Sequence, residues 1–408
     1  MTDRPSQGPL AGLRVIELGH FVAAPFCTRL LADLGADVIK VEPPGGDPVR
    51  QWGQQVNGVA PWWSMHARNK RSVTLNLKHP GARSIVLDLV RTADVLVENF
   101  RPGQLAKMGL GDAALREANP GLVVAHISGF GLDGPYRDRA AFGVIGEAIG
   151  GLRYLCNHPA GTTDLPPVRI GISIGDSLAG LYAAFGIMAA LWRRDAANGG
   201  DGKPRTLDVA LTDSVLSMME GMLPEYGVQG TVREPVGSRI PTAAPTSAYT
   251  CSDGKWIIAA ANSQPLWAKL AALMGRPELA TDPRFVDNPS RVANVEELDR
   301  LIGEWTRTMT AAEADRKLEQ ADIPSTLIYS AADVAADPQF RGRGMVQEVD
   351  DPAFGRPVLH AGVVPLVMDD PGAIRWPGAA IGAHTAEVLG EIGLDEDAVT
   401  TLRVEGVL

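Results

Sequence analysis

The first 211 residues alternate short apolar runs with segments of helical periodicity. The runs, each with the length and composition of a buried strand, lie at 14–18, 37–42, 72–77, 94–97, 122–126 and 207–211. Between them, apolar residues recur at helical spacing, for example over 24–34 and 81–91. Because strands that alternate with helices usually form a parallel sheet, we expect an α/β fold with a Rossmann-like large domain.

The second half of the chain has a different pattern. A Gly- and Pro-rich stretch at 225–245 indicates a linker or an active-site loop. It is followed by predicted elements of a smaller unit: strands at 255–261 and 325–329, and helices at 264–274, 295–309 and 311–319. We therefore expect a large domain over 1–224, the linker 225–245, a small α+β domain over 246–330 and a return segment, 331–408, that rejoins the large domain.

Composition excludes several classes of protein. The net charge of -10 and pI near 5.3 argue against a nucleic-acid partner. The longest uncharged run, 178–192, is shorter than the ~18 residues of a membrane span, so we expect a core helix and no membrane partner. Cys27, Cys156 and Cys251 are scattered, and the first residues do not form a signal peptide, which predicts a cytoplasmic location. No His or Cys spacing predicts a metal site.

The loop after the first predicted strand argues against a dinucleotide. Residues 19–25 read Gly-His-Phe-Val-Ala-Ala-Pro, which lacks the G-x-G-x-x-G fingerprint. Glu42 does lie at the spacing of a ribose-binding acid, but without the glycines NAD binding is weakly supported.

Polar residues follow two of the predicted strands. Lys78 follows the strand at 72–77, and Asn99, Phe100 and Arg101 follow the strand at 94–97. Open parallel sheets bind ligands at the carboxyl ends of their strands, so we expect these residues to border one crevice.

Asp176 lies where an extended segment meets the uncharged run 178–192, and a helix is expected to begin near it. In one interpretation Asp176 is the N-cap of that helix, which contributes about 1 kcal/mol. In the other it is a nucleophile. With an ordinary pKa of ~3.9 the carboxylate is already ionised at neutral pH, so it needs no histidine base.

Five sequence blocks carry a resemblance to a known family. They are 19–50, which ends in IKVEPPGGDPVR, then NKRSVTLNLK at 69–78, VENFRPG at 97–103, ISGFG at 127–131 and IGDS at 174–177. With these blocks the chain resembles, along nearly its whole length, the class III or CaiB/BaiF-type CoA transferases.

The resemblance implies that Asp176 is the nucleophile and that a coenzyme A thioester is the substrate, with no prosthetic group. It implies CoA contacts at Val22, Ala23, Leu75, Asn76, Leu77, Lys78, Asn99, Phe100, Arg101, Lys107, Ala140, Ala141, Phe142 and Gly143, with Arg139 adding charge at the phosphates. Some members carry glutamine where this chain has Val22. The resemblance also implies an intertwined homodimer.

Two other functions stay open beside CoA transfer. Similar 2-methylacyl-CoA racemases place a histidine base in the segment that here reads Ala141-Phe142-Gly143, and phenylalanine cannot take a proton. A non-catalytic acyl-CoA-binding protein is the second alternative.

The segments 142–151 and 166–180 look most like members that move CoA from succinyl-CoA to a short dicarboxylic acid. Arg169, Arg233 and Arg239 are candidates to bind the distal carboxylate. Malate, citramalate, mesaconate, itaconate and glutarate are not separated by the sequence.

Overall fold

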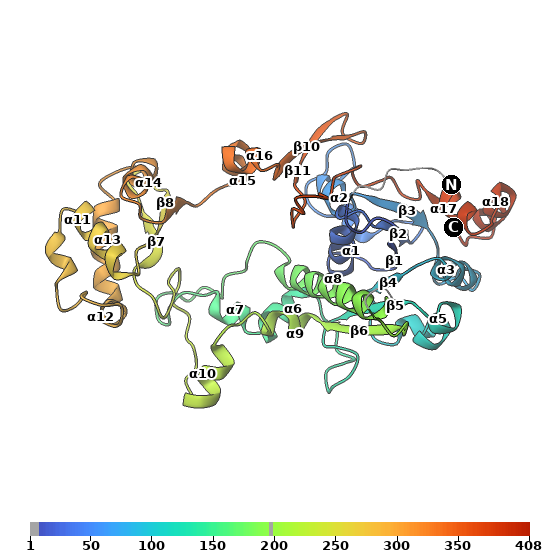
Figure 1. The fold of residues 1–408 in the computed structure, drawn as a ribbon, viewed down its shortest axis with the longest axis horizontal. Helices are drawn as coiled ribbons and strands as arrows, with labels where there is room; N and C mark the ends of the chain where they lie inside the picture. The colour runs from blue at the N-terminus through green and yellow to red at the C-terminus, as the bar shows by residue number, and fades with distance from the viewer. Residues whose placement is uncertain (1–7, 196–198) are drawn as a thin grey trace. The chain divides into compact units, whose positions relative to one another are not determined.

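The computed structural model describes residues 8–195 and 199–408, which form two compact units (Figure 1). The first unit comprises the chain up to 153 together with 169–230 and 338–408, and the second comprises 154–168 and 231–337. The predicted boundaries differ from these units in three places. They put 154–168 in the large domain and 331–337 in the return segment, whereas both segments belong to the second unit. They also set 225–245 apart as a linker, whereas 225–230 belongs to the first unit and 231–245 to the second.

The first unit is built on a six-stranded parallel sheet, so the predicted α/β architecture is confirmed. The strands are β1 (Arg14–Glu17), β2 (Asp37–Glu42), β3 (Lys70–Thr74), β4 (Val95–Glu98), β5 (Val123–Ser128) and β6 (Arg205–Ala210). Their order, β3-β2-β1-β4-β5-β6, is that of Rossmann folds. The strands are added toward one edge from β1 to β3 and toward the other edge from β4 to β6, and such sheets bind ligands where this order switches, between β1 and β4.

Helices cover both faces of the sheet. The helices of this unit are α1 (Ala23–Asp33), η1 (Pro48–Gln51), α2 (Pro61–His66), α3 (Ala82–Arg91), α4 (Gln104–Lys107), α5 (Asp112–Ala118), α6 (Gly143–Ile149), α8 (Ile174–Arg194), α9 (Leu211–Leu216), α10 (Met222–Gln229), α16 (Pro338–Gly342), α17 (Thr385–Glu391) and α18 (Glu396–Val404). The short helix α7 (Leu152–Leu155) crosses the boundary at which the second unit begins. One apolar core lies between the sheet and α1 and α8, and another lies beneath α3, α5, α17 and α18 (Figure 1). The predicted linker at 225–245 is wrong at its start, because α10 occupies it.

Helix α8 packs closely on α1. A Cβ at Gly180 would lie 2.6 Å from the carbonyl oxygen of Ala23, so only glycine permits this contact. By length and composition α8 is also apolar enough to cross a bilayer, but its packing on α1 and the sheet is that of a core helix.

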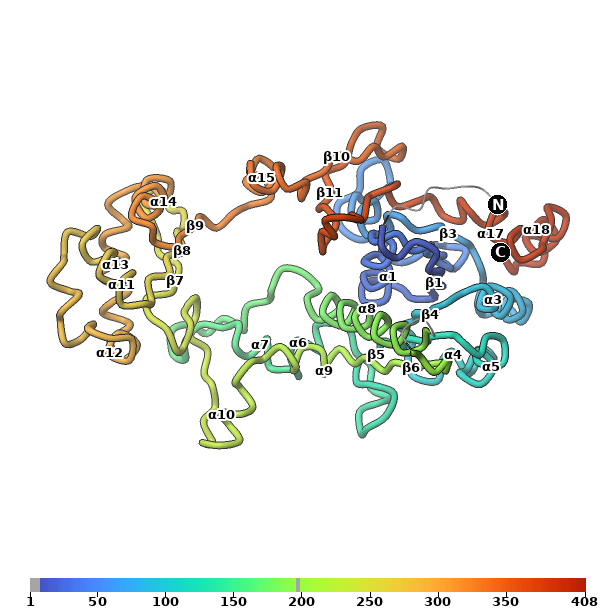
Figure 2. The backbone as a smooth tube through the Cα atoms, viewed as in Figure 1, coloured from blue at the N-terminus to red at the C-terminus, as the bar shows by residue number. Residues whose placement is uncertain are grey.

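The C-terminal segment returns to the edge of the sheet (Figure 2). It contains the antiparallel pair β10 (Val346–Asp351) and β11 (Arg356–Ala361). The amide of Asn69 donates to Ala373 O at 2.8 Å, and Asn76 N donates to Val407 O at 2.8 Å. These contacts cover β3, which would otherwise be an open edge strand.

The second unit has its own core. Strands β7 (Thr246–Thr250), β8 (Trp256–Ala260) and β9 (Ser325–Leu327) form an antiparallel sheet. Its helices are α11 (Gln264–Leu273), η3 (Pro277–Ala280), α12 (Asn288–Ala293), α13 (Val295–Thr306), α14 (Ala311–Gln320) and α15 (Ala331–Ala336). Trp267 and Phe285 are fully buried between sheet and helices, an α+β arrangement.

A buried ion cluster joins the first three strands of the parallel sheet. Glu17 in β1 pairs with Lys40 in β2 at 2.6 Å and with Lys70 in β3 at 2.8 Å, and all three side chains are almost fully inaccessible. Burial alone would raise the pKa of Glu17, but the two ammonium groups lower it to about 2. The lysines also donate to the carbonyls of Gly19 and Pro25, at 3.0 and 2.6 Å, which fixes the loop between β1 and α1.

The substitution Glu17→Gln should destabilise the protein by about 3–5 kcal/mol, because it leaves the buried ammonium group of Lys70 without its carboxylate partner and leaves Lys40 with Asp47 alone. Urea denaturation measures this change in the free energy of unfolding. Glu117→Gln removes the same charge from an exposed position of α5 and should stay within about 0.5 kcal/mol of the parent. Equal stabilities of the two variants would contradict the role given to Glu17.

Candidate active site

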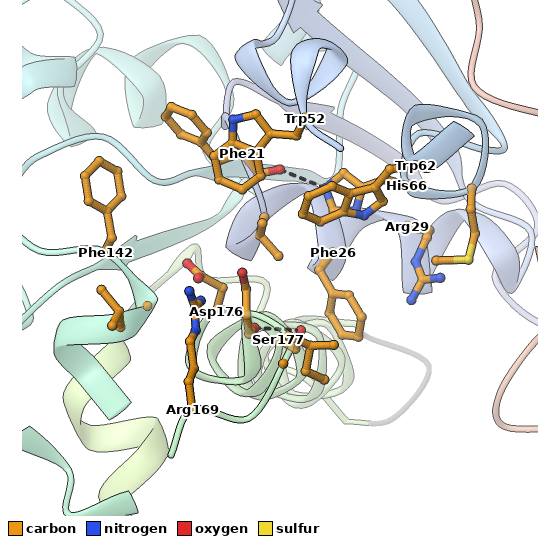
Figure 3. A pocket seen from close by; sticks show the side chains of 17 residues that line it. Phe21, Phe26, Arg29, Trp52, Trp62, His66, Phe142, Arg169, Asp176 and Ser177 are labelled. Atoms are coloured by element: carbon orange, nitrogen blue, oxygen red, sulfur yellow. Dashed lines mark hydrogen bonds between the residues drawn. The ribbon is translucent and has the colours of Figure 1, made fainter. Parts of the chain in front are cut away.

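Asp176 lies in the first turn of α8 and lines a cavity of about 690 Å³ (Figure 3). The helix begins at Ile174 and its N-cap is Ser173, so the interpretation of Asp176 as the N-cap is wrong. The backbone N–H groups of Gly143 and of Asp176 itself lie near the carboxylate and lower its pKa. The carboxylate is half-buried and faces the cavity.

Glycines allow the first turns of α6 and α8 to meet at this carboxylate. A Cβ at Gly143 would lie 2.0 Å from Oδ2 of Asp176, and one at Gly175 would lie 2.7 Å from the carbonyl oxygen of Gly143. No larger residue fits at either position without moving the backbone or the carboxylate. The backbone of Gly143 therefore lies directly against the carboxylate of Asp176.

The surroundings of Asp176 change its acidity. Burial, together with the negative charge of Glu147, raises the pKa of Asp176 to about 6. Arg169 and the two N–H groups act in the opposite direction. The expectation of an ordinary aspartate pKa is wrong, but at pH 7 the carboxylate is still about nine-tenths ionised. A half-desolvated, ionised carboxylate is a stronger nucleophile than one in water.

Glu147 is the buried neighbour behind this carboxylate. It lies in α6 and pairs with Arg153 at 3.1 Å, while its Oε1 has no hydrogen-bond partner. Its side chain packs beside Gly175, directly under the first turn of α8. A fixed negative charge is thereby held close to Asp176.

The wall of the cavity is largely aromatic and was not predicted. Phe21, Phe26, Trp52 and Trp62 line it from three different segments (Figure 3). Phe21 has a φ of 60°, in the left-handed region, and the ring Nε2 of His66 donates to its carbonyl at 2.8 Å. Burial lowers the pKa of His66 to about 3, so this imidazole is neutral. The signal in the sequence was the density of tryptophan after the second strand.

A second cavity, of about 430 Å³, lies at the carboxyl ends of β3 and β4. Leu75, Asn76, Leu77, Lys78, Phe100 and Arg101 line it together with His20. The predicted shared crevice for Lys78 and Arg101 is therefore present in the structure.

Hydrogen bonds of Glu98 and Asn99 fix the turn that carries Arg101. Asn99 accepts from the N–H of His20 at 2.8 Å and donates to its carbonyl at 2.8 Å. Glu98 accepts from Phe100 N and also contacts His126. Asn99 thus has a structural partner already, and the rest of the turn faces the cavity.

The remaining predicted positions divide between the cavities and other surroundings. Val22, Phe142 and Gly143 line the larger cavity with Asp176. Ala23, Lys107, Arg139, Ala140 and Ala141 line neither cavity; Ala23 is buried, and Arg139 stacks on Tyr136 at 4.4 Å. Of the three arginines proposed for a distal carboxylate, Arg169 lines the larger cavity, Arg239 pairs with Asp299 at 2.6 Å in the second unit, and Arg233 also lies in that unit.

Glu42 does not face a ligand. Its carboxylate accepts from Arg50 at 2.8 Å, from Ser72 at 2.6 Å and from Asp47 N at 2.9 Å, and it is almost fully buried. The carboxylate of Glu42 is therefore bound by groups of the protein itself and is not available to a ligand. Among residues 8–195 and 199–408 no group of His, Cys, Asp and Glu side chains has the arrangement of a metal site.

Comparison with known proteins identifies the family. The model of CoA-transferase family III matches residues 10–385. The chain belongs to this family. This CoA-transferase is 44% identical to a succinyl-CoA–D-citramalate CoA-transferase of Chloroflexus aurantiacus over 100% of both chains, and 38% identical to the beta subunit of a succinyl-CoA–L-malate CoA-transferase of the same organism over 98% of both. A crystal structure of a CaiB/BaiF family protein from Brucella suis superposes with a TM-score of 0.82 at 35% identity, covering 95% of this chain and 100% of that one. The predicted resemblance is confirmed, and the protein is an enzyme that acts on CoA thioesters.

The loss of activity at acid pH, the acid limb of the pH–activity profile, should follow the protonation of the Asp176 carboxylate. Activity should fall as the pH drops through about 6, because protonation removes the charge of the carboxylate. Glu147→Gln removes the neighbouring charge, so the limb should move to lower pH by up to about one unit while burial, the larger cause, remains. The measurement is kcat/KM between pH 4.5 and 8 for both proteins and for Glu117→Gln, which should keep the parent limb. A limb that stays in place in Glu147→Gln would contradict this account.

Proposed function

We propose that this CoA-transferase moves CoA from succinyl-CoA to a short dicarboxylic acid through an aspartyl-CoA thioester at Asp176. The observation that carries the proposal is the ionised carboxylate in the cavity wall, next to the backbone of Gly143 at the start of α6. Two relatives, 44% and 38% identical to this chain, are named as succinyl-CoA transferases of D-citramalate and L-malate, which supports the choice of donor and of acceptor class.

The reaction proceeds by exchange of acyl groups at Asp176. Its carboxylate attacks the thioester carbonyl of succinyl-CoA, the C–S bond breaks, and CoA leaves as thiolate while a mixed anhydride forms. The thiolate then attacks the aspartyl carbonyl and releases succinate, which gives the aspartyl-CoA thioester. The carboxylate of the acceptor attacks this thioester, and the same two steps in reverse produce the new acyl-CoA and free Asp176.

The N–H of Gly143 is placed to stabilise the negative oxygen that forms on the aspartyl carbonyl. It lies near the carboxylate and lowers its pKa, and the glycine lets the backbone approach without a side chain. For CoA we propose the cavity at 75–78 and 100–101, where Lys78 and Arg101 supply charge for phosphates. The other CoA contacts expected from the resemblance remain part of this proposal.

A racemase is less well supported. Phe142 is 66% exposed and lines the cavity where a racemase places its histidine base. Among the described residues that line this cavity the histidine is His66, whose Nε2–H is engaged by Phe21 O and whose ring is a weak base. An acid–base pair on both sides of an α-carbon is therefore missing from this wall.

We also propose that the active protein is an intertwined homodimer in the cytoplasm. Helix α8 exposes Leu181, Phe185, Met188 and Trp192 at spacings of four, three and four residues, which forms one apolar stripe. A stripe of this kind on a core helix supports a second copy as its cover.

Sedimentation equilibrium should give twice the mass of 43.3 kDa for the parent protein. Phe185→Glu introduces a charge into the stripe, so we expect it to weaken the dimer. A parent protein that sediments as a monomer while fully active would contradict the dimer.

The central residue is tested by substitution. Asp176→Ala should lower transfer from succinyl-CoA to any acid by at least about 10⁴-fold, because Asp176 is the one carboxylate among the described residues that line this cavity. The assay offers malate, citramalate, mesaconate, itaconate and glutarate as acceptors, and CoA binding is measured in parallel. Retained CoA binding with lost transfer is the expected result, whereas transfer by Asp176→Ala would overturn the proposed mechanism.

A further inference from the structure

Arg29 is a buried cation with no acceptor of its own. It lies on α1, is 9% exposed, and lines the same cavity as Asp176. Its Nε is buried without a hydrogen-bond partner, and its guanidinium lies over the ring of Phe26 at 4.7 Å from the centroid. A buried guanidinium is normally paired, so this one is prepared for an anion that comes from outside the chain.

The acid nearest to Arg29 is already occupied. Asp33 lies one turn later on α1, and both of its oxygens accept from Arg68, at 2.9 and 2.7 Å. Asn69 adds a third bond to Asp33 at 2.8 Å. Arg68 and Asn69 therefore use the carboxylate of Asp33, which attracts Arg29 only through space.

The charges in the cavity wall leave one cation in excess. Its charged side chains, among the described residues, are Arg29, Arg169 and Asp176, while His66 is neutral. Arg169 lowers the pKa of Asp176 and thus offsets its charge. Arg29 lies on the other side of Phe26 in Figure 3, away from the reacting carboxylate.

We propose that Arg29 binds the carboxylate of the substrate acid that is farthest from the reacting carbon, which makes it a residue that determines specificity for dicarboxylic acids. The inference rests on the proposed function. An acid whose first carboxyl group reacts at Asp176 brings one further negative charge into the cavity, and Arg29 supplies the matching positive charge. A bidentate pair between guanidinium and carboxylate is the strongest contact available to such a substrate.

The apolar side chains around Arg29 explain why its contact should strongly favour a dicarboxylic acid over an acid without the distal carboxylate. Phe26, Trp62 and Met65 line the cavity along with Arg29, so water is a poor competitor there. An acid with a methyl group in place of the distal carboxylate would leave the guanidinium buried and unpaired. Sites that lose a charged partner in this way reject the analogue.

The test compares each diacid that the enzyme accepts with its analogue in which methyl replaces the distal carboxylate. Suitable pairs are malate with 2-hydroxybutyrate and glutarate with pentanoate. In Arg29→Met the kcat/KM for the diacid should fall about 10- to 150-fold, mostly through KM, while that for the analogue stays within about threefold. In a ping-pong reaction kcat/KM of the acceptor reports only the second half-reaction, so a changed affinity for succinyl-CoA does not distort the comparison.

Two further variants act as controls. Arg29→Lys keeps a positive charge without the planar fork and should retain part of the preference for diacids; if Arg29→Met does not fold, Arg29→Lys carries the same comparison. Arg91→Gln removes an exposed arginine of α3 and should leave both acids unchanged. Diacid and analogue that lose activity equally in Arg29→Met, or a preference that persists in it, would overturn the assignment of Arg29. A parent enzyme without any preference for diacids would instead overturn the dicarboxylate part of the proposed function.

Discussion

The position of the active-site wall depends on the buried ion pairs that Glu17 forms with Lys40 and Lys70. Glu17 joins three neighbouring strands through Lys40 and Lys70, and the same lysines donate to the carbonyls of Gly19, in the loop from β1 to α1, and of Pro25, in the first turn of α1. That loop carries Phe21 and Val22, which line the cavity opposite Asp176. Because removal of one member leaves uncompensated buried charge, the cluster fixes the loop more firmly than apolar contacts alone would.

The second constraint is the close approach of α6 and α8. Gly143 and Gly175 let two first turns meet, so that backbone N–H groups reach Asp176 while the carboxylate keeps a face in the cavity. Burial and the charge of Glu147 make it less acidic than a free aspartate, and the N–H groups and Arg169 keep it ionised near neutral pH. A carboxylate so placed is prepared to attack, because part of its solvation has already been removed.

The sequence predicted the sheet because buried parallel strands leave short apolar runs, and it predicted the crevice of Lys78 and Arg101 because both follow such runs. It did not predict the pKa of Asp176, since both the burial of the carboxylate and the approach of Glu147 arise from tertiary packing. Arg29 was missed for a similar reason. In the sequence it is one of several charged residues in a predicted helix, and nothing shows that it is unpaired. It has no partner because Arg68 and Asn69, which are distant in sequence, bind the carboxylate of Asp33. The boundary errors at 154–168 and 225–230 arose because Gly and Pro mark turns but do not say which core a segment joins.

The central claim is that an acyl group and then CoA are carried by the side chain of Asp176. It is tested most directly by incubating the enzyme with succinyl-CoA, adding hydroxylamine, and locating the modified residue by peptide mass spectrometry. The account predicts a hydroxamate on the peptide that contains Asp176, formed only when the thioester is present. An enzyme that exchanges acyl groups while Asp176 stays unmodified, or that carries the label on another residue, would contradict it.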